Sequence, residues 1–284
     1  MIEVQDLHFT YPRAHSEAVQ DLSFTIERGE IFGFLGPSGA GKSTTQKVLI
    51  GILHGYHGSV KVMGKDLADH TSDYYESIGV SFEFPNVYSR LTGAENLAFF
   101  ASLYSGRTAD PRALLDMVGL STDADTRVAH YSKGMQMRLN FCRSLLNEPE
   151  ILFLDEPTSG QDPVNARRVK DIILNEKAAG RTVFLTTHDM SAATELCDRV
   201  AFIVDGRIVM VDAPHELMIH SGRHVVRVEF VDDGTTSTRD FDLTNLGSNG
   251  DFLELIREHE VRTIHSLEAS LEDVFIEVTG QRLS

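Results

Sequence analysis

The feature that most constrains this chain is a glycine-rich stretch at residues 36–44. It reads Gly-Pro-Ser-Gly-Ala-Gly-Lys-Ser-Thr, so one glycine and four free positions precede Gly-Lys-Ser. The apolar run at residues 31–35 predicts a buried strand before it, and residues 43–53 predict a helix after it. A glycine-rich turn between a strand and a helix directs several backbone N–H groups at one anion, close to the positive end of the helix dipole. The stretch therefore predicts a phosphate-binding loop rather than a turn without chemistry.

Within this loop the residue types predict separate roles. Lys42 is expected to reach the β- and γ-phosphates of a nucleotide, and the Ser43 hydroxyl is expected to hold Mg²⁺. The other loop residues are predicted to contact the nucleotide: Gly36, Pro37, Ser38, Gly39, Ala40, Gly41 and Thr44.

Charge and composition argue against several classes of protein. The 284 residues carry a formal net charge of −16, which disfavours a protein that holds nucleic acid through a broad basic face. Cys142 and Cys197 are too few for a disulfide scaffold and fit a reducing cytoplasm. The first residues do not resemble a secretory signal, and no apolar run approaches the roughly 18 residues of a membrane-spanning helix. A membrane role is therefore expected to come through a partner chain.

Two apolar stretches end in ionisable side chains. Residues 151–154 lead into Asp155 and Glu156, and residues 182–187 lead into His188. A continuous apolar strand is typical of the middle of a parallel sheet, and α/β proteins bind ligands at the carboxyl ends of such strands. We therefore expect these side chains to belong to one site. The alternatives are a helix cap followed by a chance acid, and a histidine with a structural role.

The remaining pattern predicts an α/β fold. Residues 2–10 predict an edge strand, in an antiparallel layer that residues 58–66 join. Residues 85–147 predict a mostly helical region, in which Thr92 and Glu95 have the spacing of a capping box. Strands that alternate with helices on this scale predict a largely parallel sheet.

The end of the chain predicts a separate small unit. We expect residues 1–217 to form the main domain and residues 218–284 to form a small α+β domain. Within the latter, residues 225–231 predict a strand and residues 267–278 a final helix. The unit has no chemical motif, and its expected role is to support a dimer or to pack on the main domain.

Residues 132–136 connect these features. Their sequence, Ser-Lys-Gly-Met-Gln, resembles the Ser-Gly-Gly-Gln signature of ATP-binding-cassette (ABC) ATPases. With the phosphate loop, the two-acid strand and the strand-end histidine, residues 2 to about 217 resemble an ABC nucleotide-binding domain. The resemblance implies a P-loop NTPase (RecA-like) core, an antiparallel β subdomain and a helical subdomain at about residues 85–147. The Tyr-Ser-Lys-Gly-Met form and the tail at residues 266–275 resemble stand-alone ATPase subunits that pair with ABC-2-type permeases, often in drug, antibiotic or polysaccharide export.

The resemblance implies ATP and Mg²⁺ as cofactors and gives the candidate residues their roles. Asp155 would hold Mg²⁺ through water, and Glu156 would be the general base toward the attacking water. His188 would bind the γ-phosphate and brace Glu156, so that Lys42, Glu156 and His188 are the implied catalytic residues. Tyr11, otherwise a surface tyrosine in a turn, would stack on the adenine.

The resemblance also implies two protein partners. Ser132, Gly134 and Gln136 would touch the γ-phosphate bound by a second copy of the chain, and Asp162 lies in a loop that communicates across the dimer. Two nucleotides would then lie between two head-to-tail subunits in a C₂ arrangement. The other partner is an integral-membrane permease, which would hold the chain at the cytoplasmic face of the membrane. No nucleic acid partner is expected.

One residue departs from the family pattern. The family usually has glutamine where this chain has Glu83. A glutamate keeps an oxygen for the metal and adds a negative charge near the γ-phosphate. The change is either a tolerated substitution or the cause of an altered metal affinity or a slower turnover.

Together these features predict the energising subunit of an ABC transporter. The chain would hydrolyse MgATP and power a separate permease, as part of an exporter for a drug-like or other small molecule. Two alternatives remain, a soluble ATP-driven switch unrelated to transport and a nucleotide-binding module with slow hydrolysis.

Overall fold

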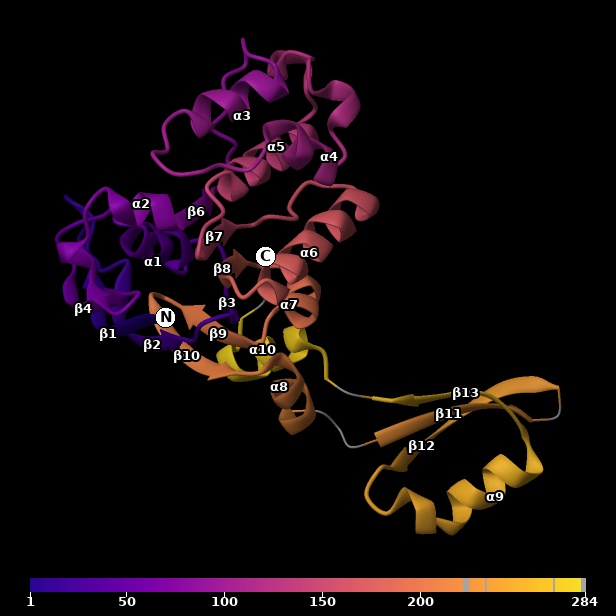
Figure 1. Ribbon diagram of the computed structural model, residues 1–284. Helices are drawn as coiled ribbons and strands as arrows, with labels where there is room; N and C mark the ends of the chain where they lie inside the picture. Colours follow the sequence, from indigo (N-terminus) through magenta and orange to yellow (C-terminus); the bar gives the residue numbers. More distant parts are fainter. Residues whose placement is uncertain (222–224, 233, 268, 282–284) are drawn as a thin grey trace. The chain divides into compact units, whose positions relative to one another are not determined.

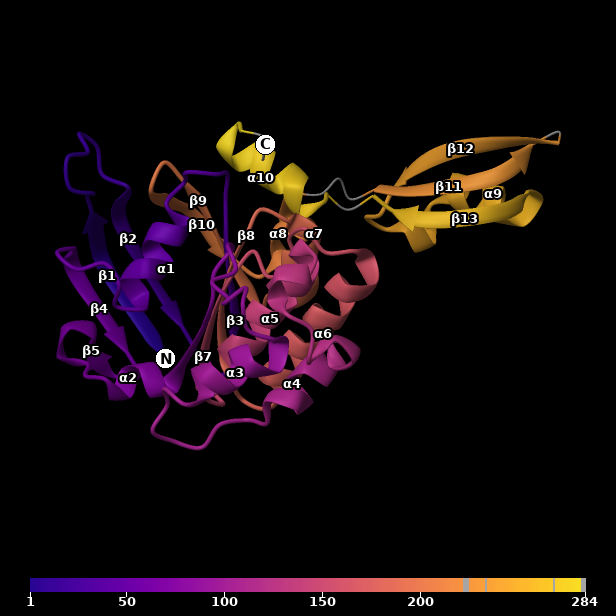
Figure 2. The same cartoon turned by 90° about the horizontal axis from the view of Figure 1, so that it is seen from above.

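The computed structural model describes residues 1–221, 225–232, 234–267 and 269–281. The chain forms two compact units, Met1–Ala213 and Pro214–Gln281, which we describe separately (Figures 1 and 2).

The first unit is organised around a six-stranded sheet in the order β10-β9-β3-β8-β7-β6. All neighbours run parallel except β10, which forms an antiparallel hairpin with β9. Strands β3, β7 and β8 are buried at every position, because helices and the second sheet cover both faces. The largely parallel sheet that the sequence predicts is confirmed. The strands are β3 (Ile31–Leu35), β6 (Ile78–Ser81), β7 (Ile151–Asp155), β8 (Thr182–Thr187), β9 (Arg199–Val204) and β10 (Arg207–Asp212).

The second sheet is antiparallel, in the order β2-β1-β4-β5. Its strands are β1 (Ile2–Phe9), β2 (Val19–Ile26), β4 (His57–Val62) and β5 (Lys65–Asp66). Strand β1 pairs with both β2 and β4, so the prediction of an edge strand at residues 2–10 is wrong. The alternation of apolar and polar residues shows that one face of β1 is buried. It does not show whether β1 pairs with a neighbouring strand on one side or on both.

A single core joins the two sheets of this unit. Phe24 of β2 stacks on Phe32 of β3 with ring centroids 5.6 Å apart, and it also lies 5.5 Å from Phe34. Phe184 of β8 continues this aromatic cluster at 5.5 Å from Phe34. Apolar residues of helix α1, among them Val48 and Leu49, belong to the same core. The phosphate loop and its helix are therefore held between the two sheets.

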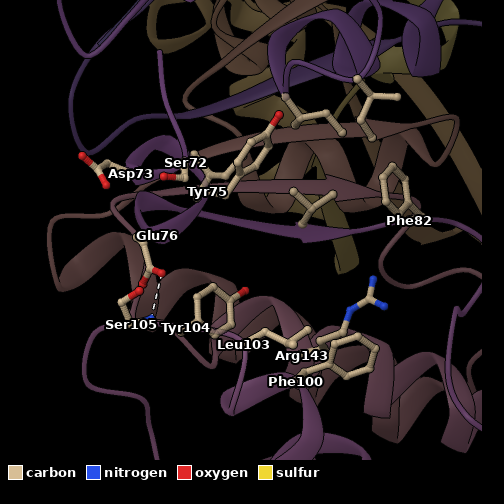
Figure 3. Close-up of a pocket in the computed structure, with 14 residues that line it drawn as sticks. Ser72, Asp73, Tyr75, Glu76, Phe82, Phe100, Leu103, Tyr104, Ser105 and Arg143 are labelled. Carbon is tan, nitrogen blue, oxygen red and sulfur yellow. Dashed lines mark hydrogen bonds between the residues drawn. The ribbon is translucent and has the colours of Figure 1, made fainter.

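Seven helices of the first unit are α1 (Lys42–Leu49), α2 (Asp73–Ser77), α3 (Gly93–Ala101), α4 (Pro111–Met117), α5 (Lys133–Leu145), α6 (Pro163–Ala178) and α7 (Met190–Leu196). Helix α1 is shorter than the predicted 43–53, because Gly51 adopts a φ of 75° that ends helical geometry. The capping box at Thr92 and Glu95 is confirmed at the start of α3. Helix α5 lies so close to β6 that a Cβ on Gly79 would collide with the Ser144 carbonyl. A pocket of about 520 Å³ remains between α2, β6, α3 and α5 (Figure 3).

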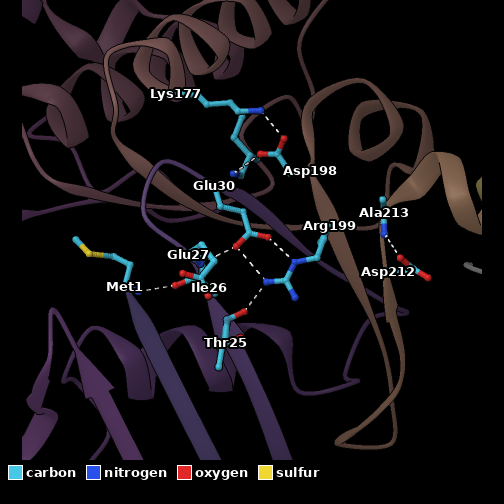
Figure 4. Close-up of polar contacts among 11 residues, drawn as sticks. Met1, Thr25, Ile26, Glu27, Glu30, Lys177, Asp198, Arg199, Asp212 and Ala213 are labelled. Carbon is cyan, nitrogen blue, oxygen red and sulfur yellow. Dashed lines mark hydrogen bonds and ion pairs between the residues drawn. The ribbon is translucent and has the colours of Figure 1, made fainter.

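A partly buried ion pair joins Arg199, at the start of β9, to Glu30, just before β3, and a hydrogen bond from Arg199 reaches β2 (Figure 4). Arg199 donates from Nε and Nη2 to the Glu30 carboxylate at 2.7 and 3.1 Å, and from Nη2 to the Thr25 carbonyl at 2.8 Å. The hydrogen bond to Glu30 raises the pKa of Arg199. Lys177 of α6 pairs with Asp198, which accepts from the Ile31 amide at 2.9 Å. These contacts fix the strand that feeds the phosphate loop.

Arg199→Met is expected to lower the free energy of unfolding of the first unit by about 2 kcal/mol, because it leaves the buried Glu30 carboxylate without its cation. The loss is smaller than for a fully buried pair, since 34% of the Arg199 side chain is exposed. Arg28→Met is the matched control. It breaks an exposed pair with Glu150 and should cost less than about 0.5 kcal/mol. Equal losses in urea titrations of the two variants would contradict a structural role for the Glu30–Arg199 pair.

The second unit contains helices α8 (Pro214–Ser221), α9 (Gly250–Glu258) and α10 (Leu271–Thr279) and strands β11 (Val225–Asp232), β12 (Thr235–Asp242) and β13 (Glu260–Ser266). The strands form an antiparallel sheet in the order β12-β11-β13. Phe252 and Leu255 of α9 pack on one face of the sheet against Val228 and Phe241. The final helix begins at Leu271 instead of residue 267, because Ser270 and Asp273 form a capping box there. Of the tail residues 266–275, Glu268 lies outside the described residues.

Across residues 1–221, 225–232, 234–267 and 269–281, no helix is both long enough and apolar enough to cross a membrane.

Candidate functional site

The phosphate loop is shaped by close backbone approaches. A Cβ on Gly36 would collide with the Ile203 carbonyl, and a Cβ on Gly41 would lie 2.7 Å from the Ala18 carbonyl oxygen. Gly39 and Gly41 also adopt φ values of 83° and 107°, which side chains disfavour. The Ala40 carbonyl accepts from the Gly206 amide at 3.0 Å, so the turn between β9 and β10 braces the loop. These glycines are required by geometry, as the sequence pattern predicts.

Lys42 is the first residue of α1 and its side chain turns back under the loop. The Nζ atom donates to the Gly36 carbonyl at 2.6 Å and to the Pro37 carbonyl at 3.0 Å. Burial lowers the pKa of Lys42, and the carboxylates of Glu156, Asp155 and Glu83 oppose that shift. The phosphate loop thus encloses the Lys42 ammonium group, which lies in the same pocket as the carboxylates of Glu83, Asp155 and Glu156.

That pocket has a volume of about 270 Å³ and lies at the carboxyl ends of β3, β7 and β8. It brings together most of the predicted site residues: Ser38, Gly39, Gly41, Lys42, Ser43, Thr44, Glu83, Asp155, Glu156 and His188. Backbone amides and a lysine line one side, and carboxylates line the other. This is the distribution that a phosphate group with a bound cation requires.

Asp155 and Ser43 face each other in the pocket. The Ser43 hydroxyl donates to Asp155 Oδ2 at 3.3 Å, and the Thr186 hydroxyl donates to Asp155 Oδ1. Both Ser43 and Asp155 present hard oxygen atoms, and Glu83 adds a third oxygen donor to the same pocket. Oxygen donors of this kind, together with phosphate oxygens and water, suit Mg²⁺.

Glu156 is held in one orientation by the end of β8. Its carboxylate accepts from the Thr187 hydroxyl at 2.9 Å and from the His188 amide at 2.9 Å. His188 Nδ1 lies 2.6 Å from Glu156 Oε1, and because a carboxylate only accepts, Nδ1 carries the proton. Nε2 of His188 is then left for another partner. The side chain of Glu156 is 10% exposed and that of His188 is 60% exposed, so the histidine lies on the solvent side of the acid.

Tyr11 is tied to the phosphate loop without lining the pocket. Its hydroxyl lies 3.1 Å from Thr44 Oγ1, and its ring packs edge-on against Phe9 with centroids 5.0 Å apart. Tyr11 is 36% exposed, so part of the residue is accessible to solvent beside the loop.

The remaining predicted residues lie outside this pocket. Ser132 caps α5 by accepting from the Met135 amide at 3.2 Å, and Gln136 donates to the Tyr131 carbonyl at 3.2 Å. Asp162 caps α6, and the hydrogen bond from the Asn165 side chain lowers the pKa of Asp162. A Cβ on Gly134 would lie 3.7 Å from the Gly160 carbonyl oxygen, which places the start of α5 beside the loop that precedes α6. Within one chain, Ser132, Gly134, Gln136 and Asp162 do not line the pocket that contains Lys42.

Sequence reasoning missed two features of the site. The first is the pair Thr186 and Thr187, whose hydroxyls orient the carboxylates of Asp155 and Glu156. Their position at the end of a predicted strand does not indicate these hydrogen bonds. The second is the pocket between α2, β6, α3 and α5, where exposed apolar side chains gather (Figure 3). Ile52 is 52% exposed, Tyr75 51% and Leu103 64%. These residues are far apart in the sequence, so no local pattern could show that they share a surface.

Comparisons with known proteins agree with this geometry. The family model described as ABC transporter matches residues 19–159, and the one described as fluoroquinolone efflux ABC transporter C-terminal domain matches residues 224–268. The fluoroquinolones export ATP-binding protein of Mycobacterium tuberculosis (strain ATCC 25618 / H37Rv) is 61% identical over 285 residues, with 100% of this chain and 95% of that protein covered. The daunorubicin/doxorubicin resistance ATP-binding protein of Streptomyces peucetius is 36% identical, with 93% and 88% covered.

Solved structures show the same fold. The structure of an ATP-binding subunit of an ABC transporter has a TM-score of 0.70 and 29% identity, with 78% of this chain and 92% of that chain covered. A dimeric ATP-binding cassette in a post-hydrolysis state, bound to ADP and Pi, has a TM-score of 0.68 and 25% identity, with 75% and 98% covered. This chain belongs to the ABC transporter family as an ATP-binding subunit, close to drug and antibiotic export ATPases of the ABC-2 type. Members of this family hydrolyse ATP.

Proposed function

We propose that this chain hydrolyses MgATP to power a separate membrane permease that exports drug-like molecules of the fluoroquinolone class. The observation that carries the proposal is the single pocket in which Lys42, Ser43, Asp155, Glu156 and His188 meet. The substrate class comes from the relative that is 61% identical along the whole chain and from the match of the second unit. The same relatives favour a transporter subunit over an ATP-driven switch unrelated to transport.

The residues of the pocket divide the chemistry between them. The glycine-rich loop and Lys42 bind the phosphates, and Tyr11 stacks on the adenine. Ser43, Asp155 and Glu83 would hold Mg²⁺, which offsets the charge on the β- and γ-phosphates when it is bound.

Glu156 acts on the attacking water and His188 on the γ-phosphate that is transferred to it. Glu156 accepts a proton from the attacking water as general base. Thr187 and the His188 amide orient its carboxylate, which keeps its lone pair directed at one position. His188 donates from Nδ1 to Glu156 and leaves Nε2 for the γ-phosphate.

Two partners complete the proposed function. A second copy of the chain would supply Ser132, Gly134 and Gln136 to the phosphates bound here, with Asp162 at the contact between copies. The solved relatives include dimeric cassettes, which supports this arrangement.

The permease would dock on the apolar pocket lined by Tyr75, Phe100 and Leu103 and would hold the chain at the cytoplasmic face of the membrane (Figure 3). A helical segment with apolar side chains would suit this pocket, whose lining also includes the charged side chains of Asp73, Glu76 and Arg143.

The role of Glu83 leads to a direct test of the metal site. Glu83→Gln replaces an anionic oxygen ligand by a neutral one, so the Mg²⁺ concentration for half-maximal ATP hydrolysis should rise by about tenfold. Repulsion between Glu83 and the γ-phosphate acts in the opposite direction, but the cation lies between the two and offsets most of it. The measurement is a Mg²⁺ titration of phosphate release at fixed ATP for both proteins. Superimposable curves would show that Glu83 does not contact the metal, and activity that survives removal of Mg²⁺ by EDTA would exclude MgATP as the substrate.

A further inference from the structure

The loop that carries Glu83 is anchored at both ends by one helix. Asn140 of α5 donates from Nδ2 to the Phe82 carbonyl at 2.9 Å, on the residue directly before Glu83. Arg143 of α5 donates from Nη1 to the Asn86 carbonyl at 2.8 Å, three residues after Glu83. The intervening backbone is therefore fixed to α5 rather than to the sheet that it leaves.

Asn140 is completely buried, with 0% of its surface exposed. Its Nδ2 also donates to the Ser81 hydroxyl at 3.0 Å, so both amide hydrogens are used at the end of β6. Because the Phe82 carbonyl can only accept a hydrogen bond, the Asn140 side-chain amide must point its nitrogen, and not its oxygen, toward the end of β6. A polar side chain at this depth costs stability unless it is hydrogen-bonded, and both of these bonds go to the residues that lead into Glu83.

Packing alone does not hold the Glu83 loop in place. The Glu83 side chain is exposed, and a cavity of about 430 Å³ lies beside the loop, lined by residues that include Lys47, Phe84 and Asn86. The loop thus has room to move toward or away from Ser43 and Asp155, which line the same cavity. Its position depends on the hydrogen bonds at its ends.

A second asparagine makes the same kind of contact at the other end of β6. Asn147 follows α5 and donates from Nδ2 to the Glu76 carbonyl at 3.0 Å and to the Ile78 carbonyl at 2.9 Å. Asn140 therefore binds the chain where β6 ends and Asn147 binds it where β6 begins, and β6 is an edge strand of the six-stranded sheet. Asn147 thus gives an internal control, because it fixes β6 without touching the Glu83 loop.

We propose that Asn140 is a positioning residue that couples Glu83 to helix α5. Ser132 and Gly134 lie at the start of α5, on the surface proposed to meet the nucleotide of the second copy. Asn140 lies further along the same helix and holds the loop of Glu83, whose carboxylate is proposed to face the metal. One helix therefore connects the two sites. Any shift of α5 when the second copy docks would then move Glu83 with it. This inference rests on the proposed role of Glu83 at the metal.

The test is a Mg²⁺ titration of the full chain carrying Asn140→Leu, followed both by ATP hydrolysis and by Mg²⁺-dependent equilibrium binding of a fluorescent ATP analogue, which should shift together. Leucine fills a similar volume but cannot donate to the Phe82 carbonyl. The Mg²⁺ concentration for half-maximal activity should rise by about tenfold, the lower end of the effect of residues that orient metal ligands. Asn147→Leu should leave this concentration within about twofold of the unmodified chain, although both variants lose a buried amide and both should melt earlier. The titrations are run at a temperature where both variants are almost fully folded, so that a loss of stability alone changes the half-maximal concentration by little.

The double variant with Glu83→Ala separates the two claims, because alanine has no oxygen to offer the metal. If Asn140 acts through Glu83, Asn140→Leu should add no further shift in the Glu83→Ala background. An added shift in that background, an unchanged curve for Asn140→Leu, or an equal shift for Asn147→Leu would overturn the positioning role. An unchanged curve for Glu83→Gln alone would instead refute the proposed metal role, and the inference with it. Asn140→Ser, which is smaller and polar, gives the same comparison where Asn140→Leu does not fold.

Discussion

Glu156→Gln is expected to retain ATP binding and to lose at least about 10²-fold of the rate of hydrolysis, the usual scale for removal of a general base. The amide cannot take a proton from water, but it has the shape of the carboxylate and keeps one acceptor oxygen, which can stay on the His188 amide while the NH₂ group turns to the Thr187 hydroxyl. The phosphate loop and Ser43 are unchanged, so nucleotide affinity should persist. Because bound ATP is no longer consumed, the variant should accumulate as a nucleotide-bound dimer.

Single-turnover phosphate release and equilibrium binding of a fluorescent ATP analogue measure the two parts of this prediction. Glu150→Gln is the matched control, since Glu150 pairs with Arg28 at the surface and lies outside the pocket. It should hydrolyse ATP at the unmodified rate. Turnover by Glu156→Gln within about threefold of the unmodified chain would remove Glu156 from the role of general base.

Ser132→Arg is expected to abolish ATP-driven dimerisation while the isolated subunit still binds ATP. Ser132 lies outside the pocket that contains Lys42, so the subunit's own phosphate contacts remain. In the proposed dimer, a large cationic side chain would occupy the space that the second copy's γ-phosphate needs. Analytical ultracentrifugation with ATP, in the Glu156→Gln background to prevent turnover, measures the loss of the dimer directly.

The control for this variant separates the dimer contact from helix capping. Ser132 caps α5, and loss of the cap costs about 1 kcal/mol when alanine or arginine replaces it. Ser132→Ala loses the cap but adds no bulk, so it should still dimerise. A dimer of Ser132→Arg as stable as that of Ser132→Ala would show that the start of α5 does not face a second copy's nucleotide.

Features set by short stretches of sequence could be predicted for this chain. The phosphate loop is one example, because the positive φ values of Gly39 and Gly41 are a local feature and a helix follows immediately. The capping box at Thr92 and Glu95 is another, since both partners lie within one turn. The parallel sheet followed from apolar strands that alternate with helices, a pattern that persists along the whole first unit.

Features set by contacts between distant residues could not be predicted. Strand β1 was expected at an edge, yet it pairs with β4, which lies more than 40 residues further along the chain. Asn140 gave no signal, because a polar residue in a helix does not show which distant carbonyl it binds. Thr187 likewise acts on Glu156 only after β7 and β8 are neighbours in the sheet.

The central claim is that ATP hydrolysis at this pocket drives export through a permease. Its most direct test uses inside-out membrane vesicles that contain the chain with its permease and are supplied with a fluorescent fluoroquinolone. With MgATP, vesicles that carry the unmodified chain should accumulate the drug, and vesicles with equal amounts of the Glu156→Gln chain should not. Equal accumulation in both preparations, or steady ATP hydrolysis by the unmodified complex without accumulation, would contradict the claim.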